Sequence, residues 1–450
     1  MDAFNENSNE QQAQQPMGCL HRFSKTIKVV IIGLLILLLM IPMFMIENLI
    51  SERGRTQEEA IDEVSEKWSL AQTITGPYLN LQYPVVTENN GEKKVSIKDL
   101  ILFPDELTIN GQLKTEILKR SIYEVNVYQS ELTLKGSFSS EELKKSRIDM
   151  EQLQFDRAAI CLNLTDMRGI SEQISITLGD SVYIFEPGMD NRGIDNTGVH
   201  AIANLSELKQ NKKLPYEIKI KLKGSQSLNF IPLGKTTRVD LKANWNTPSF
   251  TGNYLPNNRN ITEKEFSAQW QVLNLNRNYS QVMADYNTSN IKDIENSSFG
   301  VNFKIPVEQY QQSMRSAKYA ILIILLTFGV IFFTEIMNKT RIHALQYLLV
   351  GLALCLFYSL LLSFSEHIGF NPAYLLSSAL TIILVGGYMF GITKKKKPSL
   401  IMSGLLGILY LYIFVLIQLE TFALLAGSLG LLIILAMVMY FSKKIDWFNE

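Results

Sequence analysis

Apolar positions are gathered into long unbroken blocks at two places in the chain. The first block covers residues 27–46, and five more follow near the C-terminus, at 319–337, 343–363, 373–391, 400–416 and 421–440. A helix needs about 20 apolar residues to cross roughly 30 Å of hydrocarbon. The pattern therefore predicts six transmembrane helices. The first is interpreted as an uncleaved signal anchor, because its apolar core is long and no A-x-A-like cleavage site follows it.

Positive charges flank these blocks on one side only. Lysine and arginine precede the first span, lie between spans two and three and between spans four and five, and follow the sixth. The opposite connections, 365–372 and 418–420, contain neither. Because basic residues concentrate in cytoplasmic loops, both termini are expected in the cytoplasm and residues 47–318 outside, which is the periplasm in a cell that has an outer membrane. The polar residues 1–26 are expected to be a disordered tail, and residues 441–450 a second cytoplasmic tail.

In the long segment between the first two spans, apolar and polar residues alternate, so that the hydrophobic pattern repeats every two residues. Residues 216–222 alternate between apolar and charged side chains, and shorter stretches at 125–134 and 174–178 repeat the pattern. Such alternation is typical of half-buried strands. The chain is therefore predicted to be an α+β membrane protein, with residues 47–318 forming a mainly antiparallel β domain and residues 319–440 a five-helix bundle.

Three local signals refine this domain. Thr56 with Glu59 predicts a capping box that opens a helix. Asn90-Gly91 and Asn110-Gly111 are typical of tight hairpin turns, in which both central residues need positive φ. The tetrapeptide LKGS occurs at 134–137 and again at 222–225. The repeat indicates either a duplicated β unit or a coincidence.

Composition narrows the possible functions. Lys+Arg and Asp+Glu are equal at 43 each, so no basic surplus indicates a nucleic-acid partner. The three cysteines are too scattered for a disulfide framework or a zinc site, and no two histidines are close in sequence. We expect no metal and no cofactor. Cys161 is interpreted as a buried apolar residue, and His200 as a structural histidine.

Polar side chains at the outer ends of the spans form one candidate site. They are Glu366, His367, Glu420, Gln418, Arg315 and Lys318. In a compact bundle they could converge, and paired carboxylates with a histidine suit acid–base chemistry. The alternative is that they lie at the water boundary and pair with one another. Spans two to six carry no ionisable group near mid-depth, which disfavours an ion-coupled transporter; Glu335 lies near a cytoplasmic end.

A second candidate is the aromatic, Asn- and Pro-rich stretch at 244–256. Its candidate contact residues are Asn244, Trp245, Phe250 and Tyr254. Aromatic faces stack on sugars and asparagine bonds hydroxyls, so the loop suits a carbohydrate or peptide contact. Packing of the same rings against the domain is the alternative. Two small-xxx-small pairs, Gly387/Gly391 and Ala423/Gly427, predict helix contact faces.

The chain resembles the CreD family of bacterial inner-membrane proteins over residues 25–450. The matching stretches include YEVNVYQSELTLKGSF (123–138), DMRGI (166–170), GVHA (198–201), FIPLGKTT (230–237), PVEQYQQSMRSAKYAILIILLTF (306–328) and QYLLVGLALCLFYSLLLSFSEHIGF (346–370). Ser121 stands where the family more often has glycine, Asn246-Thr247 where it has Pro-His, and Ala344 where proline is usual. The missing histidine disfavours catalysis at that loop. The resemblance implies a role in cell-envelope integrity and, in some bacteria, in a β-lactam response.

Three functions follow from these observations. The first is a non-catalytic protein whose exported domain binds or organises an envelope component. The second is a membrane enzyme or lipid-handling protein that uses Glu366, His367 and Glu420. The third, a transporter, suits the apolar spans least. The expected partners are the lipid bilayer and an envelope component or another membrane protein, with the ligand and the oligomeric state left open.

Overall fold

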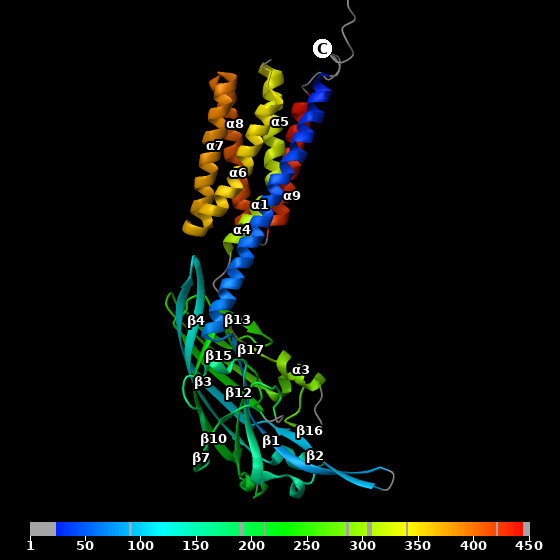
Figure 1. Cartoon of the computed structure of the whole chain (residues 1–450), viewed down its shortest axis with the longest axis vertical. Coiled ribbons are helices and arrows are strands. Elements are labelled where there is room, and N and C mark those ends of the chain that lie inside the picture. The colour runs from blue at the N-terminus through cyan, green and yellow to red at the C-terminus, as the bar shows by residue number, and fades with distance from the viewer. Residues whose placement is uncertain are drawn as a thin grey trace, which may run out of the picture. The chain divides into compact units, whose positions relative to one another are not determined.

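The structure is a computed structural model that describes residues 24–443 except 90–91, 147, 190–192, 211, 285–287, 304–307, 339–340 and 420–421. The chain divides into two compact units. The helical unit comprises Met1–Thr56 and Val307–Glu450, and the β unit comprises Gln57–Pro306 (Figure 1).

A single 45-residue helix, α1 (Ser24–Trp68), contains the first predicted span and continues into the β unit. The predicted capping box at Thr56 is wrong, because the helix does not begin there. The Thr56 hydroxyl instead donates a hydrogen bond to the carbonyl of Glu52, 3.0 Å away and one turn back. Amide groups inside a continuous helix already bond within it, so no N-terminus needs a cap at this point.

In the described residues after 307, the chain forms six helices. They are α4 (Glu308–Lys318), α5 (Ala320–Asn338), α6 (Ala344–Ile368), α7 (Phe370–Thr393), α8 (Lys396–Gln418) and α9 (Ala423–Ser442). Helices α1 and α5–α8 are long and apolar enough to cross a membrane, and α9 carries a shorter apolar stretch at Leu424–Met437. The prediction of an N-terminal span and a C-terminal group of spans is confirmed.

Helix α4 was not predicted from the sequence. It packs against α6, α7 and α8 through a face of small side chains, among them the buried Ser313, Ser316 and Ala317. Small residues let helix backbones approach closely. The predicted contact glycines behave differently, since a Cβ at Gly387, Gly391 or Gly427 would meet nothing within 4 Å in this chain.

Two sheets build the β unit. The nine-stranded sheet has the order β13-β17-β11-β1-β5-β9-β8, and β2 pairs with both β1 and β16. Its strands are β1 (Gln72–Asn89), β2 (Glu92–Leu102), β5 (Ala158–Leu164), β8 (Glu186–Pro187), β9 (Gly198–Ala203), β11 (Ser227–Phe230), β13 (Ser249–Gly252), β16 (Val282–Ala284) and β17 (Phe299–Asn302).

The eight-stranded sheet has the order β14-β15-β12-β3-β4-β10-β6-β7. Its strands are β3 (Glu106–Arg120), β4 (Tyr123–Phe138), β6 (Ser175–Leu178), β7 (Ser181–Ile184), β10 (Leu214–Ser225), β12 (Thr236–Ala243), β14 (Asn258–Ile261) and β15 (Phe266–Leu273). Most pairings are antiparallel, as predicted. The exceptions are the parallel pairs β1–β11 and β3–β12.

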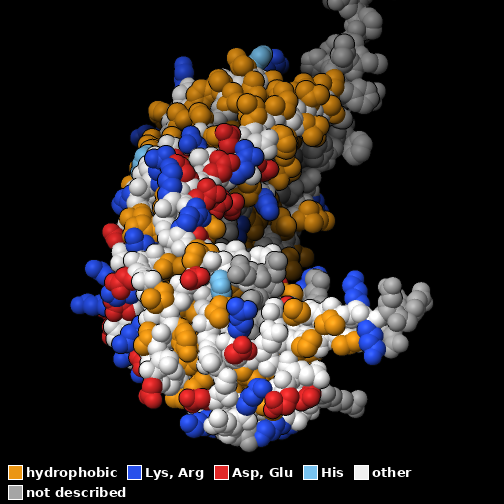
Figure 2. Space-filling view, turned by 60° about the horizontal axis from the view of Figure 1, so that its bottom comes forward, with side chains coloured by type: hydrophobic (Ala, Val, Ile, Leu, Met, Phe, Trp, Pro, Cys, Tyr) orange, Lys and Arg blue, Asp and Glu red, His pale blue; other side chains and the backbone are white. Residues whose placement is uncertain are grey.

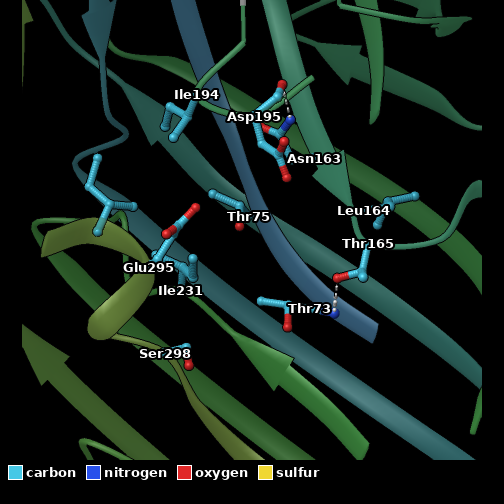
Figure 3. Close-up of a pocket in the computed structure, with 11 residues that line it drawn as sticks. Thr73, Thr75, Asn163, Leu164, Thr165, Ile194, Asp195, Ile231, Glu295 and Ser298 are labelled. Carbon is cyan, nitrogen blue, oxygen red and sulfur yellow. Dashed lines mark hydrogen bonds between the residues drawn. The ribbon is translucent and has the colours of Figure 1, made fainter. Parts of the chain in front are cut away.

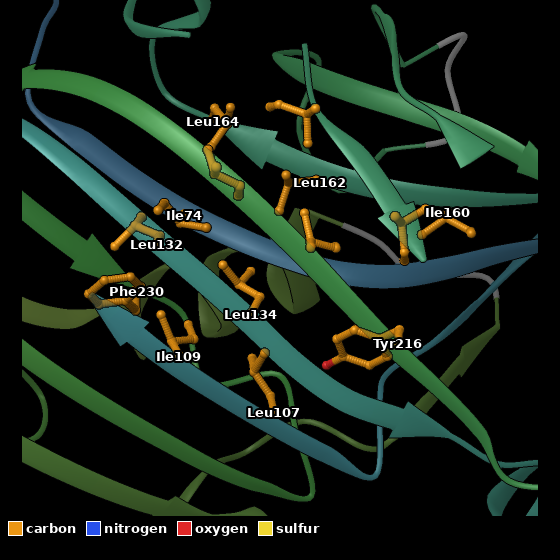
Figure 4. Close-up of a cluster of buried hydrophobic side chains, with 14 of the residues drawn as sticks. Ile74, Leu107, Ile109, Leu132, Leu134, Ile160, Leu162, Leu164, Tyr216 and Phe230 are labelled. Carbon is orange, nitrogen blue, oxygen red and sulfur yellow. The ribbon is translucent and has the colours of Figure 1, made fainter. Parts of the chain in front are cut away.

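The main core lies between the two sheets. It combines side chains such as Ile74 and Leu162 from the nine-stranded sheet with Leu134 and Ile109 from the eight-stranded sheet (Figure 4). A second buried cluster, which includes Cys161, covers the outer face of the nine-stranded sheet, where helix α3 (Thr288–Asn296) packs. The β unit therefore has three layers. Figure 2 shows basic and acidic side chains interspersed on its visible surface.

The predicted turn at Asn110-Gly111 is wrong, because both residues lie inside β3. The turn that joins β3 to β4 is at Ser121-Ile122, and Ser121 takes a φ of 57°. L-amino acids rarely adopt this left-handed conformation, so a glycine would fit there without strain. Asn90-Gly91 lies outside the described residues, although the flanking strands pair from Asn89 and Glu92 onward.

The two LKGS segments lie in neighbouring antiparallel strands, β4 and β10. Gly136 of the first faces Tyr216 in the ladder, and Gly224 of the second faces Tyr128. The two tyrosine hydroxyls donate to the carbonyls of Glu106 and Ser227, at 3.0 and 2.7 Å. Each glycine thus leaves room for a buried tyrosine of the other strand, and the pair has a local two-fold symmetry.

Candidate functional site

Glu366, the first residue of the candidate site at the outer ends of the spans, is held by two other helices. Its Oε1 accepts a hydrogen bond of 3.0 Å from the Tyr310 hydroxyl on α4. The same oxygen is 3.9 Å from Nε of Arg53 on α1, and the side chain is only 12% exposed. The sequence had suggested Arg315 and Lys318 as the cations. The cation that pairs with Glu366 is Arg53.

The other residues of that site are not brought together in the described part of the chain. Gln418 donates a hydrogen bond of 2.7 Å to Oδ1 of Asn371, which links the end of α8 to the start of α7. His367, Arg315 and Lys318 are exposed. Glu420 lies outside the described residues. A shared acid–base site at these positions therefore stays a prediction.

An ion pair joins the predicted signal anchor to the C-terminal helices. The ammonium group of Lys28 on α1 contacts the carboxylate of Glu335 on α5. The carboxylate also accepts from the backbone amide of Ile342 and the hydroxyl of Tyr347, both at 3.2 Å. The sequence indicated that both charges lie at the cytoplasmic ends of spans, but not that they pair. The contact makes α1 part of the bundle.

The residues of the candidate contact loop make structural contacts. The Asn244 side chain bonds both backbone groups of Thr115 on β3, at 2.7 and 3.2 Å. Phe250 lies edge-on to Trp270, with ring centroids 5.7 Å apart, and Trp245 and Tyr254 also pack against the main core. Burial raises the pKa of Tyr254. A ligand contact at this loop stays a prediction.

His200 and Cys161 face each other as partners in the pairing of β9 with β5. The Nδ1 of His200 is 2.7 Å from the carbonyl oxygen of Gly188, to which it donates. Cys161 is fully buried in the outer cluster. Both arrangements are structural, as the sequence suggested. Among the described residues, no group of three or more His, Cys, Asp or Glu side chains could hold a metal ion.

The β unit contains a buried arginine, Arg277, that the sequence pattern did not indicate. Arg277 donates hydrogen bonds to the carbonyls of Tyr279 and Leu233, at 3.1 and 3.0 Å, and its guanidinium lies 4.3 Å from the Tyr279 ring centroid. No described carboxylate pairs with it. Burial lowers its pKa, and the carbonyl dipoles and the ring offset the loss of water. It fixes the loop that leads into β16.

A recess of about 220 Å³ opens on the outer face of the nine-stranded sheet (Figure 3). Its floor is formed by outward residues of β1 and β5, including Thr73, Thr75 and Asn163, because alternate residues of a strand point to opposite faces. Its walls come from the loop before β9, with Asp195, and from α3, with Glu295.

The floor of this recess is rigid. The amide nitrogen of Asn163 donates to the carbonyls of Asp195 and Thr197, at 2.9 and 2.8 Å. Its oxygen accepts from the hydroxyl of Tyr78 at 2.6 Å, and that hydroxyl in turn accepts from the amide of Ile194 at 2.7 Å. These hydrogen bonds hold the floor and the neighbouring wall of the recess together. Sequence reasoning missed it, because its polar residues are spread over four separate segments.

The matches to known proteins cover nearly the whole chain. Residues 24–448 match the family model described as "Inner membrane protein CreD". The inner membrane protein CreD of Escherichia coli K12 is 32% identical over 420 residues, which cover 92% of this chain and 91% of that protein.

Proposed function

This chain belongs to the CreD family of inner membrane proteins, and we propose that it holds its β unit outside the membrane, where the β unit binds a cell-envelope component without catalysing a reaction on it. The multi-pass helical unit is then an anchor. Placement of the β unit outside rests on the distribution of lysine and arginine between the spans.

The recess at Thr75 and Glu295 is the observation that supports a binding role. Among the described residues, its lining contains no histidine, cysteine, lysine or arginine. The described residues that line it carry mainly hydroxyl, amide and carboxylate groups. Such groups suit recognition of a polar ligand by hydrogen bonds.

Photo-crosslinking in growing cells tests this function. A benzophenone amino acid replaces Thr165, an exposed residue at the rim of the recess. The matched control is Thr177, which is exposed on β6 of the other sheet. We expect ultraviolet light to attach envelope material at position 165 and much less at position 177. Equal yields at both positions, or none at 165, would contradict a binding role for this face.

A second candidate function uses Glu366, because its carboxylate is largely enclosed and bound by Tyr310 and Arg53. On this hypothesis the chain is a membrane enzyme or lipid-handling protein with a site at the outer interface. The test is survival of a deletion strain under a β-lactam or detergent, with wild type compared to Glu366→Ala/His367→Ala/Glu420→Ala at equal membrane abundance. Loss of protection supports the interfacial site, and full protection retires it.

A further inference from the structure

The charged side chains that are described in the lining of the recess on the β unit are both acidic. Glu295 reaches into it from α3, toward Thr75, while Asp195 lies at the opposite wall (Figure 3). Asp195 accepts from the amide of Asn196 and the hydroxyl of Thr197, at 2.6 and 3.2 Å. Glu295 has no side-chain hydrogen bond or ion pair in the described part of the chain. Because the described lining residues include no lysine or arginine to offset the two carboxylates, the recess disfavours an anionic ligand and favours one that donates hydrogen bonds.

The floor carries hydroxyl groups that the fold does not use. Thr75 is only 7% exposed, lines the recess and makes no side-chain hydrogen bond with the described residues. The Thr73 hydroxyl also makes no hydrogen bond with the described residues. The hydroxyl oxygen of Thr165 accepts a hydrogen bond of 3.0 Å from the Thr73 amide, and its own proton is still available to donate. The hydroxyls face the recess, where each can donate to and accept from a ligand, so they suit a ligand with both donors and acceptors.

The remaining lining is apolar and the space is small. Ile194 and Ile231, which are 7% and 4% exposed, add a small aliphatic surface next to the hydroxyls and carboxylates, and Ile294 is fully buried behind them. The volume of about 220 Å³ is below the roughly 300–1,000 Å³ of sites for drug-sized ligands. A single six-membered ring with C–H groups on its faces and hydroxyls at its edges matches this mixture of surfaces.

We propose that this recess binds one neutral sugar residue of an envelope polysaccharide. Glu295 and Asp195 accept hydrogen bonds from the sugar hydroxyls, Thr73 and Thr75 donate to and accept from them, and the exposed edges of Ile194 and Ile231 contact C–H groups of the ring. The inference deepens the proposed function and rests on it, because it names the ligand class of the same recess.

Saturation-transfer NMR with the full chain in phosphatidylcholine nanodiscs tests the proposal, since sugar-headed detergents would compete. The probe is an uncharged oligomer of N-acetylglucosamine, with ethanolamine as the cationic comparison. Glu295→Gln removes the charge and Thr75→Val removes the buried hydroxyl without changing its shape. Asp293→Asn, on the same helix but not in the lining, and Thr177→Val are the matched controls.

We expect the oligomer to bind wild type and both controls, and Glu295→Gln and Thr75→Val to bind it at least about tenfold more weakly, as loss of a charged or buried hydrogen bond predicts. Absence of binding to wild type, a preference for ethanolamine, or equal binding by all variants would overturn the sugar assignment. Those results leave the crosslink at position 165 as a separate test of the binding role. Hydrolysis of the oligomer would support the ligand class but contradict the non-catalytic function.

Discussion

Replacing Asp166 should weaken the contacts that hold the end of α1 against the sheets. Its carboxylate accepts from the backbone amide of Leu70 at 2.9 Å, and from the amide and Nε of Arg168 at 3.0 and 2.9 Å. Arg168 in turn donates to the carbonyl of Glu66 in α1, 2.6 Å away. The Asp166 side chain is 6% exposed. The Asp166 carboxylate is therefore one of the groups that hold the last turn of the helix to the sheets, together with contacts such as the ion pair between Glu63 and Arg120.

Asp166→Asn keeps the shape but replaces one acceptor oxygen with a donor, which then faces an amide proton. An unsatisfied buried donor costs about 1–3 kcal/mol, so we expect the free energy of unfolding of the β unit to fall by about 2 kcal/mol. For a unit of this size, that lowers the melting temperature by roughly 4–8 °C. Tryptophan fluorescence follows the transition, because Trp68 ends α1. Asp156→Asn, at an exposed position, is the control.

The pH dependence gives an independent check. Burial disfavours the charged carboxylate, but hydrogen bonds from Arg168 and the Leu70 amide outweigh it and hold the pKa of Asp166 below its usual value. The stability from this group is therefore complete above the unfolded-state pKa, about 3.9, and is lost as the pH falls through the lower folded-state pKa. The difference between wild type and Asp166→Asn should shrink over that acidic range. A variant that melts within 1 °C of wild type at pH 7 would refute the reasoning.

Three further predictions follow from particular contacts. Gly136→Ala should lower the free energy of unfolding by about 3 kcal/mol or prevent folding, because its Cβ would overlap the carbonyl of Glu106; circular dichroism melts measure this, and an unchanged melt would contradict it. Ser121→Gly should raise the free energy of unfolding in urea by about 0.5–1 kcal/mol, because it relieves the left-handed φ; a loss of stability would count against this strain. Lys28→Ala should lower the detergent melting temperature, because Glu335 is left without its cation, and adding Glu335→Ala should recover part of the loss; additive losses would show that the two residues do not interact.

Features that depend only on how apolar residues are spaced along the chain could be predicted from the sequence. The apolar blocks gave the spans, because length and hydropathy alone decide whether a helix crosses a membrane. Residues 216–222 gave a half-buried strand, and β10 shows the same alternation of buried and exposed side chains. The α+β class and the resemblance to the CreD family were also confirmed.

Features that depend on contacts far apart in the chain could not be predicted. Asn110-Gly111 has the composition of a turn, but β3 continues through it because it pairs with β4 and β12 on its two sides. Nothing near Glu366 in sequence indicates Arg53 as its partner. The recess combines residues near 75, 163, 195 and 295, and only the pairing of β1 with β5 and the position of α3 bring them together.

The side of the membrane on which the β unit lies is the most direct test of the account, because binding an envelope component requires it to be outside. Single cysteines at exposed Lys292 and Lys395 can be labelled in intact cells with a membrane-impermeant maleimide, after Cys19→Ser. Cys161 and Cys355 are buried and can stay. We expect Lys292→Cys to react in intact cells and Lys395→Cys only after permeabilisation. The reverse pattern would contradict the account.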